Sequence, residues 1–174
     1  EGGLGRGSSS SNSRTPTKVT FPTTPTKVVD LIGYRGYYGA YFAVTAADEI
    51  YGWGRSETGS MGIGVGTAAI WSPRKTSDFL TESGLPNTSG IKSLHILSGS
   101  ITPTCRSAMV IMNDNTIFMC GYPPQGQLGL GNANTKYQFT ELRFPTNTPI
   151  KQVSGGGWTS KTFWSVLLED GQVM

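Results

Sequence analysis

Short apolar runs separated by polar, glycine-rich turns follow one another along the chain, and this pattern predicts β-strands. A unit of apolar run, turn and second apolar run occurs three times, at 42–44, 47–49 and 50–54, at 109–112, 113–115 and 117–121, and at 166–168, 169–171 and 173–174. Asp, Asn and Gly in the turns tolerate a positive φ, so each unit predicts a hairpin. Helical spacing of apolar residues is not sustained anywhere. The chain is predicted to be all-β.

A glycine signature accompanies these units and recurs at intervals of about 60 residues, which is typical of stacked supersecondary units. The glycines that we expect to be structural, at sharp bends and close backbone contacts, are Gly5, Gly7, Gly62, Gly64, Gly126, Gly129 and Gly131. The stretch 62–67 superficially resembles a phosphate-binding loop. It lacks the Gly-Lys-Ser/Thr ending, and no helix is predicted after it. Repetition at three places favours the structural interpretation.

The combined motifs resemble the regulator-of-chromosome-condensation repeat. The resemblance rests on strands that end in Asp-Gly and Trp-Gly, followed by Gly-Gln-Leu-Gly-x-Gly, as at 166–173, 53–54 and 126–131. It implies antiparallel four-stranded blades of a β-propeller, usually seven in a complete ring. The expected division is the end of one blade and a linker at 1–26, a blade with a long connection at 27–90, a blade at 91–149, and the start of a further blade at 150–174.

Several features depart from the family pattern. The family usually places a His before the first hairpin strand, but the aligned positions are Ala40, Ser107 and Phe163. Residues 70–90 are expected to form a longer connection than the family needs, with Arg74 and Lys75 in a solvated loop. The chain begins within one glycine signature and ends just before another should begin, so we expect a partial propeller of a larger chain.

Composition and charge exclude several classes of function. The net charge of +3 comes from scattered basic residues, so the sequence shows no electrostatic footprint for nucleic acid. No apolar run approaches the length that spans a bilayer. The only histidine, His95, alternates with Leu94 and Ile96 and is predicted to face solvent. No His/Cys cluster has the spacing of zinc ligands. The carboxylate pairs at 48–49 and 169–170 are predicted to lie in hairpin turns, so we expect neither an enzyme nor a cofactor.

The two cysteines leave one question open. In a hairpin centred on Asp114, Cys120 should lie opposite Ala108, with Cys105 several residues further along the strand. A disulfide would need the loop to fold back to within about 7 Å between the Cα atoms. Disulfide and free thiols both remain open at this point.

The best candidate for a binding surface is the loop 33–39, because loops on a rigid scaffold carry most recognition and because Tyr and Arg are favoured in binding hot spots. The alternative is that some of these rings fill the core of the next blade. The candidate partner-binding residues, including one in the equivalent loop 157–161 and one in the long connection, are Tyr34, Arg35, Tyr37, Tyr38, Trp158 and Trp71.

Together these features predict a non-enzymatic β-propeller interaction module within a larger assembly. The preferred setting is a virion, such as a phage tail or fibre, or an extracellular surface, with a protein or a surface glycan as partner. The alternative is an intracellular regulator of a small GTPase, of the guanine-nucleotide exchange factor type.

Overall fold

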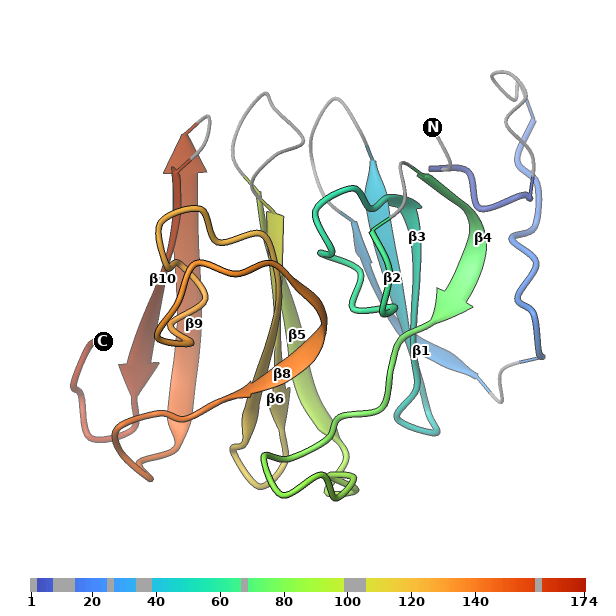
Figure 1. Cartoon of the computed structure of the whole chain (residues 1–174). Coiled ribbons are helices and arrows are strands. Elements are labelled where there is room, and N and C mark those ends of the chain that lie inside the picture. Colours follow the sequence, from blue (N-terminus) through green and yellow to red (C-terminus); the bar gives the residue numbers. More distant parts are fainter. Residues whose placement is uncertain are drawn as a thin grey trace.

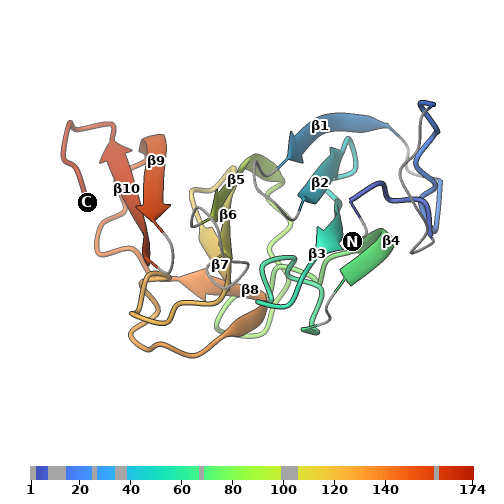
Figure 2. The same ribbon diagram turned by 90° about the horizontal axis from the view of Figure 1, so that it is seen from above.

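The computed structural model describes residues 3–7, 15–24, 27–33, 39–66, 69–98, 106–158 and 161–174. Within these ranges the secondary structure consists of strands, which form three antiparallel sheets standing side by side (Figure 1). Seen from above, the sheets are arranged like the blades of an incomplete propeller (Figure 2). The prediction of an all-β chain built from four-stranded antiparallel blades is confirmed.

In each sheet the strands are adjacent in chain order. The first sheet contains β1 (Val28–Gly33), β2 (Ala40–Thr45), β3 (Ile50–Arg55) and β4 (Ala69–Lys75). The second sheet contains β5 (Ile91–Ser98), β6 (Arg106–Met112), β7 (Ile117–Gly121) and β8 (Lys136–Leu142). The third sheet contains β9 (Ile150–Trp158) and β10 (Lys161–Leu168). A further segment begins to pair with β10, where Val166 and Met174 exchange backbone hydrogen bonds of 2.8 and 2.9 Å.

One hairpin turn is repeated in all three sheets. The N–H of the first turn residue donates to the carbonyl four residues later, at 2.9 Å each time, in Thr45, Met112 and Leu168. Three residues after each of these, the backbone takes a positive φ, at Asp48, Asn115 and Gly171. These residue types tolerate that conformation well, which explains why the turns form there. The predicted hairpins are confirmed.

Side chains between neighbouring sheets form two cores. The first, between the first and second sheets, includes Phe42, Met61 and Phe139. The second, between the second and third sheets, includes Met109 and Leu128. Because the second sheet is covered on both faces, β6 and β7 are buried along their whole length. Packing between sheets therefore supplies most of the buried apolar surface.

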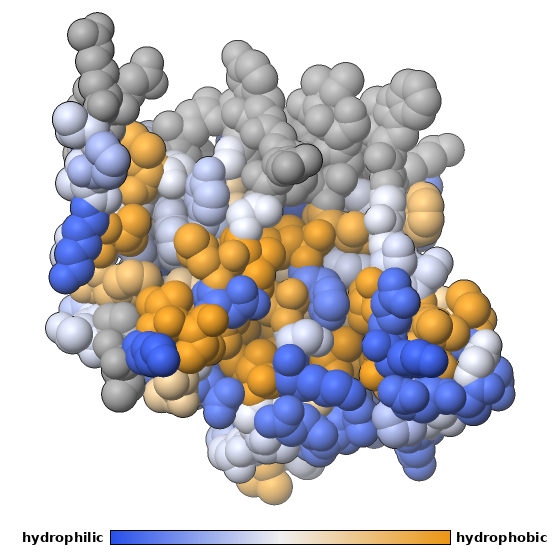
Figure 3. Space-filling view, turned by 180° about the vertical axis from the view of Figure 1, so that it is seen from behind, coloured by the Kyte–Doolittle hydropathy of each residue, from blue (hydrophilic) through white to orange (hydrophobic). Residues whose placement is uncertain are grey.

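Figure 3 shows the side of the molecule that carries β1, β5 and β9, which is the rear side in Figure 1. Hydrophobic residues gather across the middle of this side, and hydrophilic residues gather towards its lower edge. On β1, Val29 and Leu31 are 56% and 62% exposed. Neither residue belongs to the two cores between the sheets.

The expectation of a long connection at 70–90 is wrong for its first six residues, because β4 extends to Lys75. Trp71, Arg74 and Lys75 therefore lie in a strand and not in a loop. β4 pairs antiparallel with β3, and a register shift in this pairing lets the strand accommodate Pro73. The connection to the second sheet begins after this strand and includes an isolated bridge between Leu80 and Pro86.

Candidate protein-binding surface

The glycine signature forms three loops, which we define as residues 3–7, 59–66 and 126–131; the last two connect the third and fourth strands of the first and second sheets. The loop 59–66 leaves the first sheet and lies on β8 of the second, where Gly64 N–H donates to the Tyr137 carbonyl at 2.8 Å. Loop 3–7 lies on β4 in the same way, with Gly7 N–H donating to the Trp71 carbonyl at 2.8 Å. In both loops the glycine signature thus binds, through a backbone hydrogen bond, to the fourth strand of a sheet.

The backbone of these loops explains why glycine occupies them. All seven expected structural glycines have positive φ, between 62° and 84°, namely Gly5, Gly7, Gly62, Gly64, Gly126, Gly129 and Gly131. A side chain on Gly62 would place its Cβ 2.4 Å from the Phe139 ring. A larger residue at this position would therefore strain the backbone and also push the neighbouring strand away.

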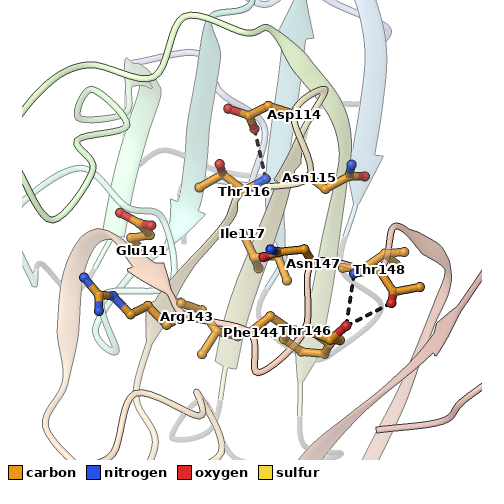
Figure 4. A pocket seen from close by; sticks show the side chains of 12 residues that line it. Asp114, Asn115, Thr116, Ile117, Glu141, Arg143, Phe144, Thr146, Asn147 and Thr148 are labelled. Atoms are coloured by element: carbon orange, nitrogen blue, oxygen red, sulfur yellow. Dashed lines mark hydrogen bonds between the residues drawn. The ribbon is translucent and has the colours of Figure 1, made fainter.

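The lower end of the sheets carries the hairpin turns and the two connections between sheets (Figure 1). A pocket of about 410 Å³ lies here between the second and third sheets. Figure 4 shows Asp114 and Thr116 above it, Glu141 and Arg143 on one side, and Thr146 with its neighbours opposite. An equivalent pocket of about 320 Å³ lies between the first two sheets and includes residues 47–50 and 75–79. The lower end therefore presents two hollows at repeat-equivalent positions.

Asp114 is fixed as an anion at the edge of the larger pocket. Burial acts to raise its pKa, but hydrogen bonds outweigh this effect and the pKa lies below the ordinary value. Its Oδ1 accepts from the Thr116 N–H, and its Oδ2 accepts from Asn87 Nδ2, both at 2.9 Å. Asn87 belongs to the connection from the first sheet, so the contact also ties that connection to the second sheet.

Glu49 and Lys75 form the matching charged pair at the smaller pocket, with Nζ 2.8 Å from Oε1. The Lys75 hydrogen bond lowers the pKa of Glu49, and the Glu49 hydrogen bond raises the pKa of Lys75. Glu49 is therefore held as an anion near neutral pH. Arg143 pairs with Glu82 near the larger pocket.

The upper end of the sheets is tied together by two contacts between sheets. Arg106, which is 3% exposed, donates from Nη1 to the Arg55 carbonyl at 3.1 Å and links the second sheet to the first. Trp164 Nε1 donates to Ser107 Oγ at 3.1 Å and links the third sheet to the second. These contacts give the loops at this end a rigid base.

The predicted partner-binding residues at the upper end are largely beyond what the structure describes. Tyr34, Arg35, Tyr37 and Tyr38 lie outside the described residues. Trp158 ends β9, and its side chain also lies outside the described part. The strands that flank these loops all end at the same edge of the molecule (Figure 1). Their role in binding therefore stays a prediction.

Trp71 has a position different from the one expected. It is half-buried in β4, and its carbonyl is the acceptor for Gly7. Tyr137 is its counterpart on β8, and the Tyr137 ring lies against Gly59 and Gly66 of the loop above it. The shared geometry favours a role for Trp71 in holding loop 3–7 against β4.

Of the other candidate chemical groups, His95 is half-buried and Cys120 is fully buried. His95 was expected to face solvent, but it is half-buried, with Nε2 3.0 Å from Ser93 Oγ. It lies opposite Met109 in the ladder, on the face covered by the third sheet, and burial lowers its pKa. Cys120 pairs with Ala108 as predicted and is a free, buried cysteine whose pKa burial raises strongly. Cys105 lies outside the described residues.

Among the residues that the structure describes, no three or more His, Cys, Asp or Glu side chains are arranged to hold a metal ion. The same part of the chain contains no helix with the length and apolar character needed to cross a membrane.

Antiparallel four-stranded blades with repeated glycine loops define the class: this chain has a β-propeller fold. No family model matches it. It is 29% identical over 131 residues to the mouse secretion-regulating guanine nucleotide exchange factor, and 28% identical over 132 residues to the bovine protein of the same name. These alignments cover 75% and 76% of the chain but only 24% and 25% of the relatives.

Solved structures show the same fold at low sequence identity. Human WBSCR16 has a TM-score of 0.61 at 17% identity, covering 90% of this chain and 34% of that one. Yeast RCC1 (Prp20) bound to Kap60 has a TM-score of 0.58 at 16% identity, covering 84% and 31%. A structure of Prp20p from Saccharomyces cerevisiae, described with its binding to Gsp1p and histones, has a TM-score of 0.56 at 15% identity, covering 82% and 32%.

The comparisons support the resemblance to the regulator-of-chromosome-condensation repeat. None of the proteins named above is described as a virion or extracellular component, so that preferred setting has no support here. A glycan partner likewise has no support among them. The chain spans about a quarter of the length of the curated relatives and about a third of the solved propellers.

Proposed function

We propose that this chain is part of an intracellular propeller that binds a small GTPase and promotes the exchange of its guanine nucleotide. The observation that carries the proposal is the 29% identity, over 75% of the chain, to a protein named as a guanine nucleotide exchange factor. The shared fold with Prp20p, which is described with its binding to Gsp1p, is consistent with a protein partner.

The chemistry of the described residues fits a protein that acts by binding. An exchange factor needs no covalent step, because it works by binding the partner more tightly in the state that has lost its nucleotide. The ionised carboxylates at the lower end and the tied sheets at the upper end supply fixed charges and a rigid scaffold. Preorganised surfaces of this kind lose little conformational entropy when a partner binds.

We assign the partner contact to the loops at the upper end and retain Tyr34, Arg35, Tyr37, Tyr38 and Trp158 as its proposed residues. These aromatic side chains offer large contact areas and directional hydrogen bonds. Trp71 is not included, because its backbone already takes part in seating loop 3–7.

The test is the release of a fluorescent GDP analogue from a panel of purified small GTPases in the presence of the protein. We expect release from at least one GTPase to accelerate by more than about tenfold, which corresponds to a barrier to nucleotide release that is lower by about 1.4 kcal/mol. A variant in which Tyr34, Tyr37 and Tyr38 are all replaced by Ala should lose this effect. Leu85→Ala is the matched control, because Leu85 is 66% exposed on the connection at the lower end. Spontaneous release rates throughout the panel would refute the proposal.

A further inference from the structure

One short sequence pattern occurs three times in the chain: a Thr or Ser, then Pro, then any residue, then Lys. It occupies residues 15–18 and 24–27 as Thr-Pro-Thr-Lys, and residues 72–75 as Ser-Pro-Arg-Lys. The second copy lies partly outside the described residues. The first and third copies are described in full, and the fold gives them opposite surroundings.

The third copy is part of β4 and is covered. The strand pairs with β3, Pro73 is buried, and Ser72 is half-buried. Loop 3–7 lies over this serine: a Cβ on Gly7 would be 3.2 Å from Ser72 Oγ, and the Gly7 N–H donates to the carbonyl of the preceding residue at 2.8 Å. An enzyme could therefore reach the Ser72 hydroxyl only after β4 had left the sheet.

The first copy is presented to solvent. All four of its residues are exposed, namely Thr15, Pro16, Thr17 and Lys18. Residues 16–20 belong to no helix, strand or turn, and the segment runs along the outer edge of the first sheet (Figures 1 and 2). A residue before a proline favours an extended backbone. The first copy thus has the accessible, irregular backbone that an enzyme groove can take up.

Contacts after the first copy hold its segment on the folded body. The Phe21 ring packs edge-on against Tyr51 and Trp53, with ring centroids 5.3 and 6.2 Å apart. Thr23 Oγ1 and Tyr51 Oη lie 3.0 Å apart and share a hydrogen bond. Because these contacts begin after Lys18, they fix the segment without covering the first copy.

The residues of this copy supply the chemistry by which a protein kinase selects a threonine. The Thr15 hydroxyl is the nucleophile. Pro16 has no N–H, so it suits an enzyme groove that offers no acceptor at this position. Lys18 places a flexible cation three residues after the threonine, where a carboxylate of the enzyme can pair with it.

We propose that Thr15 is a phosphorylation site for a proline-directed protein kinase that also selects a basic residue, and that the fold withholds Ser72 from the same enzyme. Thr15 Oγ attacks the γ-phosphorus of ATP, the bond from this phosphorus to the β–γ bridging oxygen breaks, and ADP leaves. The hydroxyl proton passes to the catalytic aspartate of the kinase. The phosphate adds about 1.5–2 negative charges at pH 7. It therefore removes at least about half of the net charge of +3 on this chain.

The test incubates the purified chain with ATP and a cyclin-dependent kinase of this specificity, and locates phosphate by site-resolved mass spectrometry. We expect Thr15 to be modified at least about tenfold faster than Ser72, because reaction at Ser72 requires local unfolding of β4. Pro16→Ala and Lys18→Ala should each slow the reaction at Thr15. Thr20→Ala is the matched control, since Thr20 is exposed on the same segment but outside the pattern, and it should leave the rate unchanged.

Two synthetic peptides, residues 11–22 and 69–78, separate the effect of sequence from that of the fold. Both contain the pattern, so the same kinase should modify both, at Thr15 and at Ser72. Modification of both peptides, but only of Thr15 in the folded chain, supports the proposal. A folded chain that stays unmodified at Thr15, or that is modified equally fast at Ser72, overturns it. A rate at Thr15 that is unchanged in Pro16→Ala also overturns it.

Discussion

Replacing Gly62 by Ala tests whether glycine is required here by contact with a neighbouring strand or only by the positive φ of the loop backbone. Gly62 has a φ of 62°, and a Cβ at this position would lie 2.4 Å from the Phe139 ring. An L-residue in this conformation costs about 1–2 kcal/mol, and the lost freedom of the unfolded chain returns about 0.4–1 kcal/mol. Overpacking against the ring adds about 1–3 kcal/mol. The expected loss of stability is therefore about 2–4 kcal/mol.

Gly129 supplies the matched control. It occupies the equivalent position in loop 126–131 with a φ of 70°, and its added Cβ would lie 3.3 Å from a terminal methyl of Leu142. That methyl group can move aside, so Gly129→Ala should cost only the backbone term, about 1 kcal/mol. The difference between the two variants isolates the clash with the neighbouring strand.

The assay is equilibrium unfolding in urea, followed by tryptophan fluorescence and circular dichroism, with coincident transitions as the test of two-state behaviour. A double-mutant cycle with Phe139→Ala completes the set. In the Phe139→Ala background, the ring that would clash with the new Cβ is absent. Gly62→Ala should then lower the free energy of unfolding by about as much as Gly129→Ala does. Equal losses for Gly62→Ala and Gly129→Ala in the original background would refute the reasoning.

Three further predictions follow from single side chains. Burial lowers the pKa of His95 in the folded protein, so the folded state loses stability as the pH falls below about 6.5, where the unfolded chain binds a proton more readily. In His95→Gln, the unfolding midpoint should therefore decline less between pH 7.5 and 5.5 than in the original protein. An unchanged decline would contradict this. Cys120 should resist iodoacetamide in the folded protein and react only after urea unfolding, as site-resolved mass spectrometry can show, because its pKa is raised and its side chain is buried; rapid labelling without urea is the contrary result. Trp164→Phe should lower the free energy of unfolding by about 1–3 kcal/mol, because it leaves Ser107, which is 1% exposed, without its donor; in a Ser107→Ala background the same change should cost less.

The hairpins were predictable because their causes are local. Residues 47–49 and 113–115 combine turn-forming types with flanking apolar runs, and the structure places Asp48 and Asn115 at positive φ. The pairing of Cys120 with Ala108 followed from the centre of the turn alone. Strand register near a tight turn depends only on turn geometry, so it can be counted from the sequence.

β4 and the environment of His95 could not be read from the sequence in the same way. β4 contains a proline and a register shift, so its pattern resembles a loop. His95 alternates with apolar neighbours as a solvent-facing residue would, but a second layer covers that face. Period-two logic identifies which residues share a face of a sheet, but it does not say whether another sheet lies against that face.

The sequence by itself determined the all-β class, the hairpin turns, the repeat spacing and the positions where only glycine fits. These depend on φ preferences and on alternation over a few residues, which act within one strand or turn. The tertiary structure decided which strands the glycine loops 3–7 and 59–66 contact, which carboxylates are held as anions and which faces are covered. These properties arise from contacts between residues far apart in the chain, such as Gly62 with Phe139 and Asn87 with Asp114, and these contacts exist only once the sheets stand side by side.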